Sequence, residues 1–212
     1  MRKPAGAEEL MITGPDGRLE CMLERPSAED IRGIAVVCHP HPLHGGTMHN
    51  KVAHTLARAF AGQGFATLRF NFRGVGGSEG SHDNGVGELD DVIAAMDRMA
   101  GEYPGTPLWL GGFSFGAAMA IRASKRREVA GLISVAPAAY RFAGDLAKQA
   151  ACPWLIVHGD EDELVPIEET IEWVNAMEPG PELVVFPGAS HFFHGKLVEL
   201  RNAVGDFVSR NS

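Results

Sequence analysis

The segment GGFSFGAA at residues 111–118 joins an apolar run to a helical pattern and is the strongest indication of the fold. It contains Gly112-x-Ser114-x-Gly116, in which the glycines let a strand and the following helix approach without Cβ clashes. The serine would stand on a tight, strained turn above the carboxyl end of the strand. The N–H of Phe115 would point where an oxyanion develops. The pattern predicts a nucleophilic serine, although a glycine-rich turn with an idle serine fits it too.

Outward from this stretch, apolar runs and helical patterns alternate along the chain. Runs rich in Val, Ile, Leu and Phe occur at residues 33–38, 66–72, 107–113, 131–135, 154–158 and 182–186. Helical patterns occur at about residues 48–61, 88–100, 115–125, 167–177 and 196–208. Most of the runs are continuously apolar, which is typical of strands covered on both faces. This order predicts an α/β fold, with a mostly parallel sheet and helices on both of its faces.

The N-terminal segment has a different pattern. Residues 9–13 and 18–23 flank the turn sequence GPDG, which favours an antiparallel hairpin at the edge of the sheet. The chain shows no internal repeat, low-complexity tract or linker. A length of 212 residues suffices for one substantial core. We therefore expect a single domain over residues 1–212.

Composition restricts the partners and the compartment. The chain has 19 Lys and Arg against 27 Asp and Glu, a formal net charge of −8, which disfavours nucleic acid or an anionic membrane as a partner. No segment approaches the roughly 20 apolar residues of a membrane span, and the N-terminus lacks the apolar part of a secretion signal. Three widely spaced cysteines fit neither a disulfide framework nor a zinc site. These features predict a soluble, cytoplasmic protein.

An exposed serine nucleophile needs a base, and the base needs a carboxylate to orient it. The segment HGDEDELVP after the fifth apolar run offers Asp160 and Asp162, and GASHFFH after the sixth offers His191 and His194. The carboxyl ends of parallel strands are where such sheets collect catalytic groups. The chain order Ser, Asp, His is that of α/β-hydrolases and differs from the orders in chymotrypsin and subtilisin.

Three features together resemble one family: the Ser114 elbow, HGxxDxxVP around Asp162 and GASHF around His191. The chain is similar to small, lidless bacterial serine esterases of the α/β-hydrolase fold, akin to dienelactone hydrolase. The resemblance covers nearly the whole chain, including NFRGxGxSxG after the second parallel strand. Dienelactone hydrolases proper use a cysteine nucleophile, so their lactone substrate is not implied. The family pattern implies Asp162 as the acid and leaves Asp160 to bind backbone in the turn; it implies His191 over His194.

The loop after the first parallel strand is rich in histidine. Five of the nine histidines lie in this region: His39, His41, His44, His49 and His54. Their spacing matches neither His-Glu-x-x-His nor a zinc finger, so no metal and no other cofactor is expected. In α/β-hydrolases this loop supplies the second oxyanion donor. Because Pro40 and Pro42 have no N–H, the N–H of His41 is expected to act with that of Phe115.

The segment at residues 138–151, where relatives carry specificity-shaping caps, is too short for a cap domain. An open cleft is therefore expected. Its candidate walls, which would bind the substrate, are Met48, Phe192 and Phe193, together with the ring of Phe115.

The resemblance and the residues together imply a serine hydrolase that acts on a small-molecule carboxylic ester or thioester. Ser114 would attack the acyl carbon, His191 would move the proton, and Asp162 would hold the imidazole. Three alternatives stay open: a peptidase with the same machinery, a non-catalytic binding module of the same fold, and a metal-dependent hydrolase built on the histidines. No decisive signal for self-association is visible, and the oligomeric state is left open.

Overall fold

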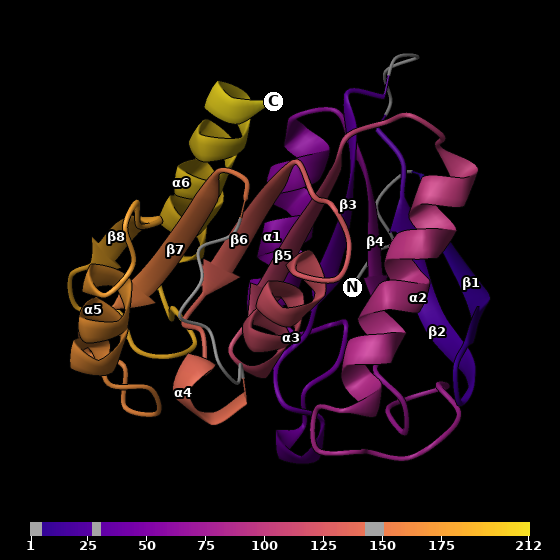
Figure 1. Cartoon of the computed structure of the whole chain (residues 1–212), viewed down its shortest axis with the longest axis horizontal. Helices are drawn as coiled ribbons and strands as arrows, with labels where there is room; N and C mark the ends of the chain where they lie inside the picture. Colours follow the sequence, from indigo (N-terminus) through magenta and orange to yellow (C-terminus); the bar gives the residue numbers. More distant parts are fainter. Residues whose placement is uncertain (1–5, 27–30, 143–150) are drawn as a thin grey trace.

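The structure, a computed structural model, describes residues 6–26, 31–142 and 151–212 of the chain. Within these residues eight strands form one sheet in the order β1-β2-β4-β3-β5-β6-β7-β8 (Figure 1). The strands are β1 (Ala7–Gly14), β2 (Gly17–Glu24), β3 (Gly33–Cys38), β4 (Phe65–Phe70), β5 (Leu108–Phe113), β6 (Gly131–Val135), β7 (Trp154–Gly159) and β8 (Glu182–Phe186). From β4 through β8 every neighbouring pair is parallel, as the alternation of strand and helix patterns predicts.

Helices cover both faces of this sheet. They are α1 (Lys51–Gly62), α2 (Gly87–Glu102), α3 (Phe115–Ser124), α4 (Ala139–Phe142), α5 (Ile167–Asn175) and α6 (Leu197–Asn211). Figure 1 shows α2, α3 and α5 in front of the sheet, with α1 and α6 behind it. Successive residues of β3 enter different cores: Ile34 and Val36 pack with the first group of helices, Ala35 and Val37 with the second. Because side chains alternate across a strand, two apolar faces require the continuously apolar runs seen in the sequence.

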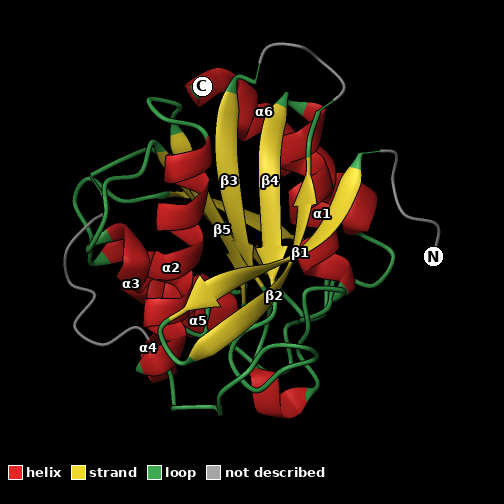
Figure 2. Cartoon of the chain, turned by 90° about the vertical axis from the view of Figure 1, so that its right-hand side faces the viewer, coloured by secondary structure: helices red, strands yellow, loops and turns green. Residues whose placement is uncertain are grey.

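The N-terminal hairpin is confirmed. β1 and β2 pair antiparallel around a two-residue turn, with Gly14 opposite Gly17. β2 then pairs antiparallel with β4, which places the hairpin at the edge of the parallel strands (Figure 2). Both strands reach further than residues 9–13 and 18–23. The wider pairing buries the C-terminal half of β2 against the rest of the sheet.

β4 ends two residues earlier than the sequence predicts. The apolar run extends to Phe72, but the strand stops at Phe70 because Asn71 and Phe72 bond to another loop. Asn71 Oδ1 accepts a hydrogen bond from the N–H of Met48 at 2.8 Å, and the N–H of Phe72 donates to His39 Nε2 at 3.1 Å. The end of β4 therefore anchors the histidine-rich loop.

The connection between β6 and β7 carries the short helix α4, which the sequence did not predict. Residues 143–150 of the expected cap-free segment lie outside the described residues. Among the described helices, none combines the length and the apolar character that a membrane span needs. The mostly parallel sheet, the N-terminal hairpin and the helices on both faces agree with the expected fold class.

Candidate active site

Ser114 lies between β5 and α3 in a strained backbone conformation. Its φ is 54° and its ψ is −116°, a region that costs a non-glycine residue free energy. Three hydrogen bonds fix it there: its N–H donates to Val135 O at 2.9 Å, and its carbonyl accepts from the N–H groups of Ala118 and Ala138 at 3.2 and 3.3 Å. The side chain is partly exposed. The end of β6 and the start of α3 therefore hold the serine at the carboxyl end of the sheet.

Two glycines permit this turn. A Cβ on Gly112 would overlap the carbonyl of Gly116, and a Cβ on Gly116 would overlap the carbonyls of Cys38 and His39. All of these neighbours are backbone atoms, which cannot move aside as a flexible side chain can. This confirms the predicted reason for Gly112, whereas Gly116 is required by the end of β3 and not by the strand that precedes the serine. It also shows that the first turn of α3 packs directly on the loop that leaves β3.

Asp162 and His191 meet across the loops that follow β7 and β8. His191 Nδ1 lies 2.8 Å from Asp162 Oδ2, and both side chains are buried. Asp162 Oδ1 accepts hydrogen bonds from the N–H groups of Leu164 and Val165 at 2.9 and 2.8 Å. A carboxylate fixed by its own turn thus orients the imidazole, and the second ring nitrogen, Nε2, is left for a different partner.

The pKa of Asp162 is held well below its ordinary value. Burial alone would raise it, but hydrogen bonds from His158, from His191 and from the N–H of Val165 outweigh the burial. His158 Nε2 lies 2.9 Å from Val165 O and 3.3 Å from Asp162 Oδ2. The sequence analysis named His158 only as the first residue of the HGxxDxxVP motif. The sequence carries no signal that distinguishes this buried histidine, which supports the acid, from an exposed one.

The structure distinguishes the two candidate acids, Asp160 and Asp162, and the two candidate bases, His191 and His194. Asp160 Oδ1 accepts a hydrogen bond from the N–H of Gly188 at 2.6 Å, so it bonds to backbone, as expected, and not to an imidazole. His194 is exposed, with its ring 6.1 Å from that of Phe192. It is therefore Asp162, and not Asp160, that the structure places beside His191.

Aromatic contacts relate His191 to the serine turn. Its ring lies 4.9 Å from the ring of Phe113, the residue before Ser114, and 5.2 Å from that of Phe192. No hydrogen bond joins the Ser114 hydroxyl to the imidazole among the described residues. Catalytic hydrogen bonds are often long without substrate and tighten in the complex. Ser114 thus directly follows Phe113, the residue on whose ring His191 packs.

His39 fixes the loop after β3. Its side chain is fully buried, with Nδ1 2.6 Å from Pro40 O and Nε2 accepting from the N–H of Phe72 at 3.1 Å. Since Nε2 accepts, the proton belongs on Nδ1 and the ring is neutral. Burial lowers the pKa of His39 to about 4, partly offset by the bond to Pro40. Sequence reasoning grouped His39 with the other loop histidines and missed this role.

Two backbone N–H groups near the serine turn, those of His41 and Phe115, have no protein acceptor within the described residues. The carbonyl of His41, by contrast, accepts from the N–H groups of His44 and Gly46, which closes the loop as a tight turn. Free N–H groups at this place are what an oxyanion needs.

Three of the four expected cleft walls are wrong. The side chains of Met48 and Phe193 are 1% and 0% exposed, so neither can form a solvent-facing wall. Phe193 packs in the core beside Phe186, with ring centroids 5.8 Å apart, and Met48 anchors its loop through backbone bonds to Asn71 and Arg69. The ring of Phe115 is buried as well. Phe192, 38% exposed beside His191, keeps the predicted position.

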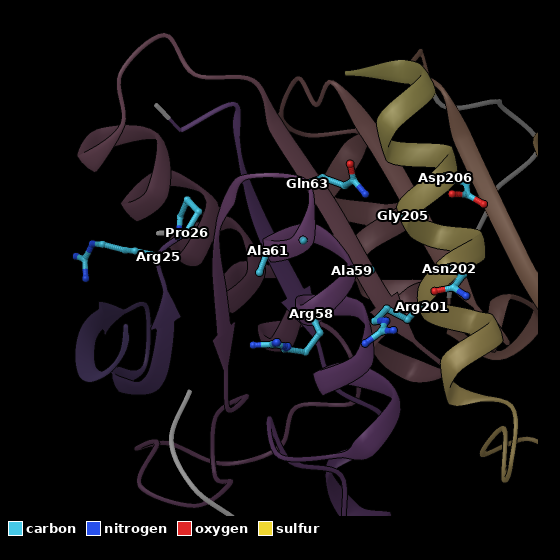
Figure 3. A pocket seen from close by; sticks show the side chains of 11 residues that line it. Arg25, Pro26, Arg58, Ala59, Ala61, Gln63, Arg201, Asn202, Gly205 and Asp206 are labelled. Carbon is cyan, nitrogen blue, oxygen red and sulfur yellow. The ribbon is translucent and has the colours of Figure 1, made fainter. Parts of the chain in front are cut away.

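No group of three or more His, Cys, Asp or Glu side chains in the described part of the chain is arranged to hold a metal ion. A groove of about 910 Å³ lies on the face covered by α1 and α6 (Figure 3). It is lined by polar and small residues, among them Arg58, Arg201 and Asp206. Neither Ser114, Asp162 nor His191 lines this groove, so it is not part of the candidate active site.

A pH titration of stability tests the buried state of His39. Unfolded His39 takes up a proton near pH 6.5, whereas the folded ring does so only near pH 4. Between these values the unfolded state binds more protons, so the free energy of unfolding should fall by about 3 kcal/mol as the pH is lowered across this window. Urea unfolding of the wild type and of His39→Gln measures the difference, with exposed His49→Gln as the matched control. An unchanged pH slope in His39→Gln would contradict the buried neutral ring.

Comparisons with known proteins find similar sequences and similar folds. Residues 34–142 match the hydrolase family described as serine aminopeptidase, S33. The chain is similar to an α/β serine hydrolase homologue from Coxiella burnetii, with 48% identity, a TM-score of 0.90, and 94% of this chain and 96% of that chain covered. It is similar to a lidless α/β serine hydrolase from Xanthomonas campestris, with 40% identity, a TM-score of 0.90 and coverage of 99% and 97%. An uncharacterized protein from Rickettsia prowazekii (strain Madrid E) is 33% identical, with 94% of this chain and 88% of that protein covered.

Proposed function

Since the chain belongs to the hydrolase family described as serine aminopeptidase, S33, and has the fold of small lidless α/β serine hydrolases, we propose that it hydrolyses carboxylic esters or thioesters. One observation carries the proposal above all. It is the contact of 2.8 Å between His191 Nδ1 and Asp162 Oδ2, made beside a serine whose φ is 54°. A buried imidazole–carboxylate pair next to a strained serine is the arrangement that nucleophilic acyl transfer requires.

The proposed reaction has two halves. Ser114 Oγ attacks the acyl carbon while His191 Nε2 takes the hydroxyl proton, and Asp162 accepts the hydrogen bond from Nδ1 and stabilises the imidazolium. The imidazolium then gives its proton to the leaving alcohol or thiol, which departs and leaves an acyl-serine. Water attacks that ester with His191 again as the base, and the acid product and the free serine are formed.

The negative charge on the acyl oxygen needs donors in both halves. We assign this role to the N–H groups of His41 and Phe115, because neither has an acceptor within the described residues. Phe115 opens α3, whose N-terminal dipole adds favourable potential at the same place. His39 supports the arrangement by fixing the loop from which the His41 N–H projects.

A peptidase is the second candidate, and the family description favours it. An aminopeptidase must bind the free amino group of its substrate, which calls for a carboxylate close to the serine. Besides Asp162, Glu163 is an acid that contacts His191: its Oε2 accepts a hydrogen bond from the N–H of His191 at 3.1 Å. Because this acid already bonds to the loop of the base, we favour esters over peptides.

Activity-based labelling and a substrate panel test the proposal. We expect a fluorophosphonate probe to label the wild type, and para-nitrophenyl esters of short acyl chains to be cleaved in preference to long ones. The panel includes acyl-CoA thioesters and aminoacyl para-nitroanilides. Absence of both labelling and turnover would favour a non-catalytic binding module, and preference for the nitroanilides would favour the peptidase. Undiminished turnover after treatment with EDTA is expected, and its loss would favour a metal-dependent hydrolase.

The proposed substrate is a small molecule, and the proposed reaction needs no cofactor. We place it in the cytoplasm, because Cys21 and Cys38 are buried free thiols and Cys152 is a half-buried one. The net charge of −8 argues against nucleic acid or an anionic membrane as a partner.

A further inference from the structure

Three imidazoles that take no part in the proposed proton transfer lie together near the start of α3. The rings of His41 and His44 are stacked, with centroids 4.6 Å apart and planes inclined by 19°. The ring of His82, which comes from the segment before α2, lies 5.2 Å from that of His41. We call these three residues the imidazole cluster. It joins two loops that are about 40 residues apart in the sequence.

Ring contacts place the cluster on one side of Ser114. The ring of His41 lies 4.9 Å from that of Phe115, the residue after the serine, and 5.3 Å from that of Phe142. Phe142 lies one turn beyond Ala138, whose N–H donates to the carbonyl of Ser114. His191 packs instead on Phe113, before the serine. Ser114 is therefore flanked by the base on one side and by the cluster on the other.

The cluster offers N–H donors. His41 Nδ1 accepts a hydrogen bond from the N–H of Leu43 at 3.2 Å, so its proton lies on Nε2, which can donate. Burial lowers the pKa of His41, and the neighbouring imidazoles add to this effect. His41 is therefore a neutral donor at physiological pH. The ring of His44 is exposed, and within the described residues no carboxylate bonds to either ring.

A buried carboxylate and a guanidinium lie next to the imidazole cluster. Glu88 is fully buried and accepts hydrogen bonds from the N–H groups of Asp83 and Gly85 at 2.8 and 2.7 Å. His82 Nδ1 lies 2.7 Å from Glu88 Oε1, but the angle is poor for a hydrogen bond. Arg122 lies on the same side, with Nη1 2.6 Å from the carbonyl of Gly85. The Glu88 carboxylate is thus held by backbone N–H groups, and the Arg122 guanidinium binds the carbonyl of the same Gly85.

We infer that the imidazole cluster binds a carboxylate carried on the acyl part of the substrate, an inference that rests on the proposed function. The leaving group must lie beside His191, which protonates it, so the acyl group lies on the opposite side of Ser114, where the cluster is. A carboxylate is the acceptor that an imidazole N–H group such as His41 Nε2–H binds best, because hydrogen bonds to an ionised acceptor are stronger than those to a neutral one. The expected substrates are half-esters of dicarboxylic acids.

A matched pair of esters tests this. Para-nitrophenyl para-carboxybenzoate carries the acyl carboxylate on a rigid ring that cannot cyclise, and its methyl ester is neutral and nearly the same shape. At about pH 7 we expect kcat/KM to favour the carboxylate by about tenfold, the effect of one good hydrogen bond to a charged group. Equal rates for the two esters, or a preference for the neutral one, would overturn the inference while leaving the esterase proposal standing.

Single substitutions test whether the preference for the carboxylate substrate comes from the imidazole cluster. His44→Phe keeps a ring to stack on His41 but removes the N–H, and we expect it to lower the carboxylate preference about three- to tenfold. His49→Phe is the matched control, because His49 is exposed on the same loop and belongs to none of the ring pairs among the described residues. An equal fall in both variants would contradict a role for the cluster.

A binding experiment without turnover tests the carboxylate site separately from the esterase proposal. In Ser114→Ala, titration with monomethyl terephthalate should shift the NMR ring signals of His41, His44 and His82 and leave that of His49 in place. These shifts in a protein that cleaves no ester would keep the carboxylate site and remove the esterase proposal. If the wild type cleaves esters but these shifts are absent in Ser114→Ala, the carboxylate site is removed and the esterase proposal stands.

Discussion

Replacing Ser114 with alanine is expected to lower kcat for ester hydrolysis by about 10⁶-fold and to abolish fluorophosphonate labelling. The hydroxyl is the only group in the proposed site that forms the acyl-enzyme, and the imidazole–carboxylate pair cannot replace it. Any remaining rate enhancement of Ser114→Ala over the uncatalysed reaction should come from the two free N–H groups of His41 and Phe115. Steady-state kinetics on a short-chain para-nitrophenyl ester measure the loss.

The control for this variant is its stability. Alanine has a Cβ as serine does, so Ser114→Ala should keep the strain at φ 54° and unfold at nearly the same urea concentration. Ser114→Gly should lose the same activity yet gain about 1 kcal/mol of stability, because glycine adopts positive φ without strain. Substantial turnover or labelling in either folded variant would remove Ser114 from the nucleophile role.

Much of the fold could be predicted because its signals are local. β3 covers residues 33–38, as its apolar run predicts, since a strand covered on both faces must be continuously apolar. β8 covers residues 182–186, also as predicted, although only Phe186 of this edge strand is buried. The Ser114 turn could be predicted because it needs glycine at fixed places. α4 was missed because four residues carry no helical period. β4 was predicted too long because Asn71 and Phe72 bond to a loop that is distant in the sequence.

The details of the site could be predicted less well, because they depend on packing between distant segments. Met48 and Phe193 look like any apolar residue near an active-site motif, and only the tertiary structure shows that both are buried. His39 and His158 are buried neutral or carboxylate-bound imidazoles, and the sequence does not distinguish them from exposed histidines. The cluster of His41, His44 and His82 joins two loops, so the histidine count in one loop could not reveal it.

Asp162→Asn should lower kcat for ester hydrolysis by about 10⁴-fold. The amide is uncharged, so it cannot stabilise the imidazolium. If its NH₂ group faces His191 Nδ1, it donates where the carboxylate accepted, and the ring is held in the wrong tautomer. The N–H groups of Leu164 and Val165 can still bond to the amide oxygen, so the turn should persist.

Asp160→Asn is the matched control, since the two acids are two residues apart in one loop. The amide introduced there would keep an oxygen to accept from the N–H of Gly188, so we expect kcat to change by less than about threefold. A loss in Asp160→Asn as large as that in Asp162→Asn would contradict the assignment of the acid.

The acid dependence of stability gives this pair a readout independent of turnover. Because the pKa of Asp162 is lower in the folded than in the unfolded state, its ionised form stabilises the fold above the unfolded value, near pH 4, and this contribution is lost as the pH falls below it. Asp162→Asn should therefore be less stable than the wild type at neutral pH, and the gap should narrow below about pH 4. Urea unfolding of both proteins across this range measures the gap. A gap that stayed constant into acid would mean that Asp162 does not draw its stabilisation from ionised contacts with His158, His191 and the Val165 N–H.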